Sequence, residues 1–144
     1  MFFVEERRIS ARLLQNNMMK EPMILSGTVV RGKALGRTVG MPTANLRITE
    51  GTIPQEGVYA TRIRLGDGVY ISVTNVGTRP TVDDESYITV ETYIIDFDRE
   101  IYGEQAVLEV HKFLRPIQKF ASLKEVQKQV QKDVNMAKIY FQEM

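Results

Sequence analysis

Apolar and polar positions alternate along much of the chain in short runs that glycine and acidic residues interrupt. The alternation is clear over Gly57–Leu65, where side chains two residues apart fall on one face of an extended backbone: Tyr59, Thr61, Ile63 and Leu65. Residues 66–68, Gly-Asp-Gly, separate this run from a second one over Val69–Val76. Asp-Gly between two alternating runs is a strong signal for a β-hairpin.

Three further runs have the same character: Leu25–Arg31, Ile88–Ile95 and Gln105–Leu114. The strands leave no room for crossover helices, so the sheet is expected to be antiparallel. An array of short antiparallel strands is typical of a β-barrel or a β-sandwich.

The hydrophobic period changes near the end of the chain. Ser122 and Glu125 have the spacing of a helix-capping box. Apolar residues then recur at steps of three and four, as in an amphipathic helix: Leu123, Val126, Val130, Val134, Ala137 and Phe141. One interpretation is that this helix covers an open part of the barrel. A short helical extension is expected over residues 1–22, before the domain at 23–144.

Composition narrows the class of protein. The 144 residues are 43% hydrophobic, which is enough for one domain with a real core. The absence of cysteine excludes disulfides and thiol catalysis. Nineteen basic and eighteen acidic residues leave a net charge of +1, which argues against a dedicated nucleic-acid or anionic-membrane binder. We therefore expect a cytoplasmic protein.

The segment Val30–Leu46 has the composition of a phosphate-binding loop. It contains three glycines and three cations: Gly32, Gly36, Gly40, Arg31, Lys33 and Arg37. Glycine lets backbone N–H groups approach an anion closely, and the cations neutralise its charge. A flexible basic loop would have the same composition, so this segment alone does not decide between the two.

A candidate metal site follows directly. Thr43 and Asn45 are two residues apart, so in an extended backbone their side chains point the same way. Two hard oxygen donors on one side suit Mg²⁺, which keeps several water and phosphate ligands. An ordinary turn containing asparagine is the alternative.

Glu91 is the candidate catalytic carboxylate. It lies in the mostly apolar run Val90–Ile95, and a buried carboxylate is costly unless it has partners. A solvent-facing glutamate on the outer wall of the barrel explains the same pattern equally well.

Several motifs, in this order, closely resemble the riboflavin kinase family. They are Gly27–Gly32, Leu35–Arg37, Gly40–Leu46, Gly57–Ala60, Asn75–Thr81, Val90–Thr92, Ile101–Gly103 and Leu114–Pro116. The likeness is greatest to the kinase module of bacterial bifunctional riboflavin kinase/FAD synthetases. It implies a six-stranded antiparallel Greek-key barrel with a C-terminal amphipathic helix. It also implies transfer of the γ-phosphate of ATP to the 5′-hydroxyl of riboflavin, giving FMN and ADP.

The resemblance also implies roles for individual residues. Thr43 and Asn45 would ligate Mg²⁺, and Glu91 would be the general base. The residues that would bind ATP are Arg31, Gly32, Lys33, Gly36, Arg37, Gly40 and Thr89. Those that would lie against the flavin are Arg115, Phe120 and Leu123. The expected partners are riboflavin, FMN, ATP and ADP, without nucleic acid or membrane, and the expected state is a monomer.

Two other classes fit part of the pattern. A non-catalytic regulator that binds flavin or nucleotide on the same barrel would not need the acid Glu91. An oligonucleotide-binding barrel would need exposed aromatic side chains on a basic face. The scattered aromatic residues and the balanced charge of this chain place that class last.

Overall fold

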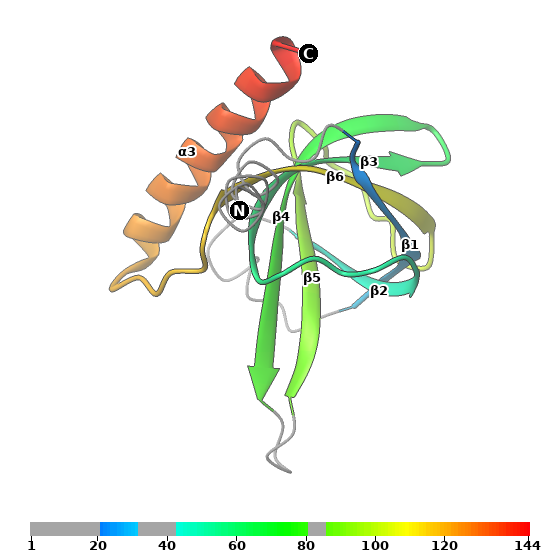
Figure 1. Ribbon diagram of the computed structural model, residues 1–144, viewed down its shortest axis with the longest axis horizontal. Helices are drawn as coiled ribbons and strands as arrows, with labels where there is room; N and C mark the ends of the chain where they lie inside the picture. Colours follow the sequence, from blue (N-terminus) through cyan, green and yellow to red (C-terminus); the bar gives the residue numbers. More distant parts are fainter. Residues whose placement is uncertain (1–20, 32–42, 81–85) are drawn as a thin grey trace, which may run out of the picture.

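The computed structural model describes residues 21–31, 43–80 and 86–144 (Figure 1). In these residues six strands are followed by one helix. The elements are β1 (Met23–Val30), β2 (Ala44–Glu50), β3 (Gly57–Leu65), β4 (Gly68–Pro80), β5 (Ser86–Ile94), β6 (Gln105–Arg115) and α3 (Leu123–Gln142).

The six strands form a closed barrel in the order β1-β2-β5-β4-β3-β6, and every neighbouring pair is antiparallel. Strands β3, β4 and β5 follow one another as hairpins, and β2 lies beside β5, which is a Greek-key arrangement. The expected fold class, a six-stranded antiparallel barrel with a C-terminal helix, is confirmed.

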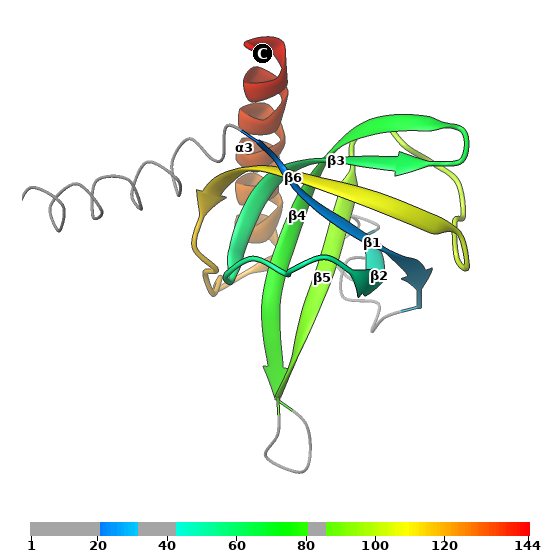
Figure 2. The same cartoon turned by 45° about the vertical axis from the view of Figure 1, so that its right-hand side comes forward.

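Two local features of the barrel position the site. Within the described part of the chain, strand β2 pairs with β5 at two positions, Ala44 with Thr92 and Asn45 with Glu91. Residues 77–80 of β4 and 86–89 of β5 pair only with each other among the described residues. We call these two segments the β4–β5 ribbon, which extends well beyond the barrel in Figures 1 and 2.

The barrel interior is filled by apolar side chains from the strands. The most deeply buried of the larger ones are Leu25, Val29, Ile63, Val76, Leu108 and Val110. The four side chains expected to share one face of β3 (Tyr59, Thr61, Ile63 and Leu65) are all buried. Burying such residues is the main contribution to the stability of a domain of this size.

A chain of hydroxyl groups crosses this interior. Thr61 Oγ1 lies 2.7 Å from Ser72 Oγ and 2.8 Å from Thr74 Oγ1, which in turn lies 2.8 Å from Thr92 Oγ1. All four side chains are fully buried. Each hydroxyl therefore finds its partner inside the barrel, which offsets the cost of removing it from water.

Helix α3 stands beside the barrel and packs against β3 and β4 (Figure 1). The apolar residues at this contact are Val58, Ala60, Val73, Ile95, Val134 and Ala137. As predicted, Ser122 caps the helix, and its Oγ accepts a hydrogen bond from the Glu125 N–H. The Glu125 carboxylate reaches back to the N–H of Ala121, one residue before the cap. Among the described residues no helix has the length and apolar character needed to span a bilayer.

His111 lies buried between β6 and α3. Its Nε2 is 3.1 Å from Glu109 Oε1, and its Nδ1 is 3.3 Å from the hydroxyl oxygen of Tyr140. The ring also meets Phe141 edge-on, at 4.9 Å between ring centroids. His111 is therefore a packing residue through which β6 contacts α3.

Burial lowers the pKa of His111, although the neighbouring Glu109 opposes this shift. The unfolded chain then binds a proton that the folded chain resists, so the free energy of unfolding should decrease as the pH falls below about 6.5. Urea denaturation at about pH 7.5 and about pH 5.5 measures this decrease, and His111→Gln should reduce it. An equal decrease in both proteins would contradict this assignment.

Candidate functional site

Asn45 and Glu91 are direct neighbours across the β2–β5 contact. Each of these residues is the registered partner of the other, and Glu91 is also paired with Asn75 on β4. Directly opposite residues project to the same face of a sheet, with their Cβ atoms about 5 Å apart. Glu91 thus lies on the outer face of the barrel between two carboxamides, and 16% of its side chain is exposed.

A pocket of about 530 Å³ opens beside Glu91. Strands β2 and β5 separate after their two pairs, and the pocket lies between the β1–β2 side and the β4–β5 ribbon. It brings together Arg31, Asn45, Thr89 and Glu91 from the predicted site. Arg47, Arg79 and Tyr87 add polar groups to its wall. We call it the Glu91 pocket.

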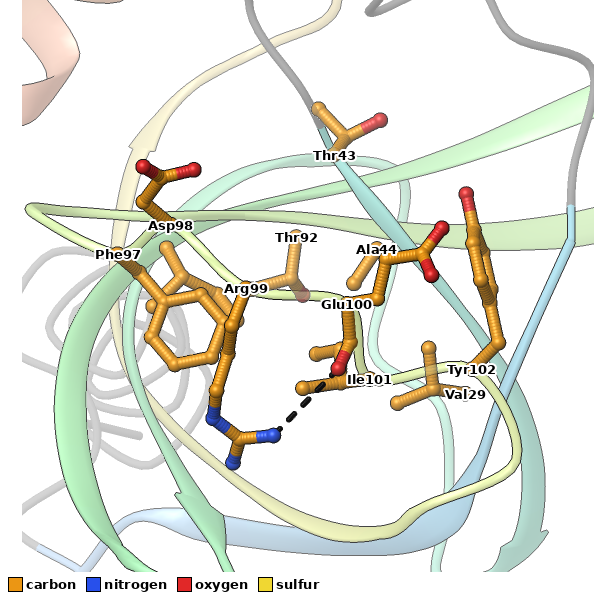
Figure 3. Close-up of a pocket in the computed structure, with 11 residues that line it drawn as sticks. Val29, Thr43, Ala44, Thr92, Phe97, Asp98, Arg99, Glu100, Ile101 and Tyr102 are labelled. Atoms are coloured by element: carbon orange, nitrogen blue, oxygen red, sulfur yellow. Dashed lines mark hydrogen bonds between the residues drawn. The ribbon is translucent and has the colours of Figure 1, made fainter.

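Thr43 lines a different pocket of about 240 Å³ (Figure 3). This Thr43 pocket has apolar side chains from Val29, Ile94 and Ile101 and charged residues from the segment 98–100. Thr43 immediately precedes β2, whereas Asn45 is the second residue of that strand. The two predicted metal ligands are therefore close in the chain but line neighbouring pockets.

Arg31 connects the two pockets. It lines the Glu91 pocket, and its guanidinium carbon lies 4.4 Å from the ring centroid of Tyr102, which lines the Thr43 pocket. A cation held over an aromatic ring in this way is attracted by the negative face of the ring. The contact places a positive charge at the boundary between the pockets.

The charged groups around the two pockets are not equally available to a ligand. On the rim of the Thr43 pocket, Arg99 bonds the carboxylates of Asp67 at 3.0 Å and Glu104 at 2.7 Å. The hydrogen bond from Arg99 lowers the pKa of Asp67. Among the described residues, Arg31 and Arg47 have no acidic partner. Positive charge that an anionic ligand could use is thus concentrated in the Glu91 pocket.

Arg79 is a site residue to which the sequence had given no role. Its Nη2 donates a hydrogen bond to Glu91 Oε1 at 3.0 Å. The two residues are 12 positions apart, and only the register of β4 with β5 reveals that they meet. The motif Asn75–Thr81 contained the arginine, but its spacing to Glu91 carried no signal of contact.

The residues predicted to bind the flavin form a separate group near the start of α3. Arg115 donates two hydrogen bonds of 2.9 Å to the carboxylate of Asp133, and its guanidinium carbon lies 5.8 Å from the ring centroid of Phe120. Leu123, in the first turn of α3, is 52% exposed.

The predicted flavin-binding residues and the Glu91 pocket lie on the same outer face of the barrel. Arg115 is paired with Val58, Val58 with Asn75, and Asn75 with Glu91. Three strand spacings, or roughly 14 Å, therefore separate Arg115 from Glu91. The structure does not bring these residues into one pocket, but it places them at two ends of one row.

Part of the predicted ATP site lies outside the described residues. These positions are Gly32, Lys33, Gly36, Arg37 and Gly40. Within the described residues, no group of three or more histidine, aspartate or glutamate side chains is placed to hold a metal ion. The ligand roles predicted for Thr43 and Asn45 rest on their neutral oxygen donors, which suit a hard cation.

Comparisons with known proteins agree in the family that they indicate. Residues 19–141 match the family model described as flavokinase, riboflavin kinase. The bifunctional riboflavin kinase/FMN adenylyltransferase of Listeria monocytogenes is 37% identical over 127 residues, which are 88% of this chain and 40% of that protein. The RNA-binding riboflavin kinase of Bacillus subtilis is 37% identical over 112 residues, covering 78% of this chain and 48% of that one.

A solved structure shows the same fold. The crystal structure of riboflavin kinase from Trypanosoma brucei matches with a TM-score of 0.57 at 21% identity, covering 85% of this chain and 78% of that chain. The match to the Listeria relative spans about two fifths of that relative's length.

Proposed function

The chain belongs to the riboflavin kinase family, and from this premise we propose that it phosphorylates the 5′-hydroxyl of riboflavin with ATP, giving FMN and ADP. The observation that carries the proposal is the direct pairing of Asn45 with Glu91 at the wall of one open pocket. The pairing brings the proposed metal ligand Asn45 beside the proposed base Glu91, and phosphoryl transfer depends on such close positioning of the metal and the base. We assign this activity to the domain at residues 23–144.

Glu91 is the proposed general base. As the hydroxyl oxygen of riboflavin forms its bond to the γ-phosphorus, the hydroxyl proton passes to the Glu91 carboxylate. The bond between the γ-phosphorus and its bridging oxygen breaks, and ADP leaves with that oxygen. A carboxylate within hydrogen-bond reach assists such a step because it takes the proton as the new bond forms.

Thr43 and Asn45 are the proposed ligands of Mg²⁺. Both offer neutral oxygen donors, and this set suits a cation that retains water and phosphate oxygens as its other ligands. When bound, the ion would neutralise charge on the phosphates of ATP. Because Thr43 and Asn45 line neighbouring pockets, a nucleotide in the Thr43 pocket could extend its phosphates past both side chains toward Glu91.

The remaining contacts follow from charge and position. Arg31, at the boundary of the pockets, would neutralise the phosphates, and Thr89, on the same wall as Glu91, would contact the nucleotide. The proposed ATP site also includes Gly32, Lys33, Gly36, Arg37 and Gly40. We propose that the flavin ring lies against the residues near the start of α3: Arg115, Phe120 and Leu123.

Replacing either proposed metal ligand should weaken the binding of Mg·ATP. We expect Thr43→Ala and Asn45→Ala each to reduce the affinity about tenfold or more, since each removes one oxygen donor. Nucleotide affinity measured by calorimetry at increasing Mg²⁺ concentrations checks this. Thr49→Ala, an exposed threonine farther along β2, is the matched control and should leave the curves unchanged. Unaltered titrations for Thr43→Ala and Asn45→Ala would remove their ligand roles.

Incubation with riboflavin and Mg·ATP tests the proposed activity directly. Chromatography should show FMN, and omission of magnesium or replacement of Glu91 should greatly reduce it. Binding of flavin or nucleotide without any FMN would instead identify a non-catalytic regulator and overturn the proposal.

We propose no nucleic-acid partner for this chain. Its charge is balanced, although one relative is named as RNA-binding. The predicted monomeric state and cytoplasmic location stay predictions.

A further inference from the structure

The carboxylate of Glu91 is held by a neighbouring arginine. Arg79 Nη2 donates to Glu91 Oε1 at 3.0 Å, and both side chains are largely shielded, with exposures of 33% and 16%. Both residues line the Glu91 pocket. Among the described residues, no hydrogen bond is made to the other carboxylate oxygen, Oε2.

The strand register explains how the two side chains meet. On the β4–β5 ribbon, Arg79 is opposite Tyr87, Gly77 is opposite Thr89, and Asn75 is opposite Glu91. Arg79 is therefore four residues, or about 13 Å, farther along β4 than the pair that contains Glu91. Its long side chain therefore extends back along the ribbon to reach the carboxylate.

Gly77 lies between these two positions on β4. A Cβ atom there would be in ordinary van der Waals contact with Thr89 Oγ1 at 3.4 Å and with Asn75 Oδ1 at 3.6 Å.

From this geometry we propose that Arg79 is a positioning residue for the kinase reaction, and the inference rests on the function proposed above. Arg79 binds Oε1 of Glu91 and fixes the carboxylate, which leaves Oε2 to accept the proton of the substrate hydroxyl. Without the guanidinium, the glutamate side chain would sample other rotamers, and fewer of them would place an oxygen against the hydroxyl. Loss of this orientation acts on the chemical step rather than on substrate binding, because a small misplacement of reacting groups is costly.

Kinetics of Arg79→Gln and Arg79→Lys test the proposal. We expect Arg79→Gln to lower kcat about 10- to 100-fold. The KM for ATP and the riboflavin Kd, measured by flavin fluorescence, should change less than about twofold. Arg79→Lys should recover most of the lost kcat, because it restores a donor with a positive charge. Arg64→Gln, an exposed arginine on β3 paired with Glu109, is the matched control and should keep the kcat of the unmodified protein.

Each alternative result has a definite meaning. An unchanged kcat in Arg79→Gln overturns the proposal, and so does a higher KM for ATP with an unchanged kcat, which would make Arg79 a nucleotide-binding residue. A lysine variant as slow as the glutamine variant overturns it too. Thermal melting checks that each variant folds, and Arg79→Met supplies a second uncharged side chain if Arg79→Gln melts early. If the unmodified protein forms no FMN, the proposed function fails first and the role of Arg79 fails with it.

Discussion

Glu91→Gln is expected to lower kcat by roughly 10²–10⁴-fold while flavin and nucleotide binding largely survive. Glutamine has nearly the same shape, and its amide oxygen still accepts the hydrogen bond from Arg79. What the variant lacks is an oxygen that takes up the proton of the riboflavin hydroxyl. Steady-state formation of FMN gives kcat, and flavin fluorescence gives the riboflavin Kd.

A matched control separates the role of Glu91 from the general loss of a paired carboxylate. Glu109 on β6 also pairs with an arginine, since Arg62 Nε lies 3.0 Å from its Oε1, but it is absent from both pockets. Glu109→Gln should therefore retain most of the turnover per folded molecule. Full turnover in Glu91→Gln would eliminate this residue as the base.

Arg115→Met is expected to lower the free energy of unfolding by about 3–5 kcal/mol. Asp133 is almost completely buried, and Arg115 supplies two of its hydrogen bonds. Methionine retains the apolar stem, and among the hydrogen bonds of the described residues it leaves the carboxylate with the one from Gln129. An uncompensated charge in the interior is costly because it has lost its hydration. Urea denaturation of both proteins measures the difference.

The reverse substitution should cost less. In Asp133→Ala the orphaned group is the guanidinium of Arg115, whose side chain is already 17% exposed and can turn toward water. We expect a loss of about 1–3 kcal/mol, the usual cost of an unsatisfied polar group. A larger loss for Asp133→Ala than for Arg115→Met would show that the buried carboxylate is not the vulnerable partner.

The sequence predicted most of the barrel because alternation and turn residues are local signals. Gly57–Leu65 was correct at both ends, and the helix cap at Ser122 was correct as well. β4 extends to Pro80, four residues past the predicted end at Val76. Among the described residues its extra positions pair with β5 and with no other strand. A two-stranded ribbon outside the barrel does not need an apolar face, so no alternation marks it.

The strand Ala44–Glu50 was not predicted. Its residues Ala44 and Leu46 are buried while Arg47 and Thr49 are exposed, so an alternating pattern is present but short. It follows a glycine-rich segment whose composition is that of a loop. Its place in the barrel depends on pairing with β1 and β5, which no local pattern encodes.

The candidate site was predictable as residue types but not as an arrangement. Asn45 and Glu91 are far apart in the sequence, and their contact follows from strand register alone. For Glu91, the sequence left open both a buried acid and an outer-wall acid. The structure combines these alternatives, since Glu91 lies on the outer wall but is shielded and ion-paired. Register also brings Arg79 within reach of Glu91, whereas Thr43, which precedes β2, lines a second pocket.

The contact between β2 and β5, which closes the barrel, is very short. In the residues that the structure describes, nine pairs join β4 to β5 and nine join β3 to β4, but two pairs join β2 to β5. The barrel should therefore open locally between β2 and β5 before the rest of its wall deforms, because local opening begins where the fewest bonds must break. The proposed metal ligand Asn45 and the proposed base Glu91 form one of these two pairs. Any widening of the barrel to admit a bulky molecule would therefore first change the separation of Asn45 and Glu91, and the packed interior would stay intact.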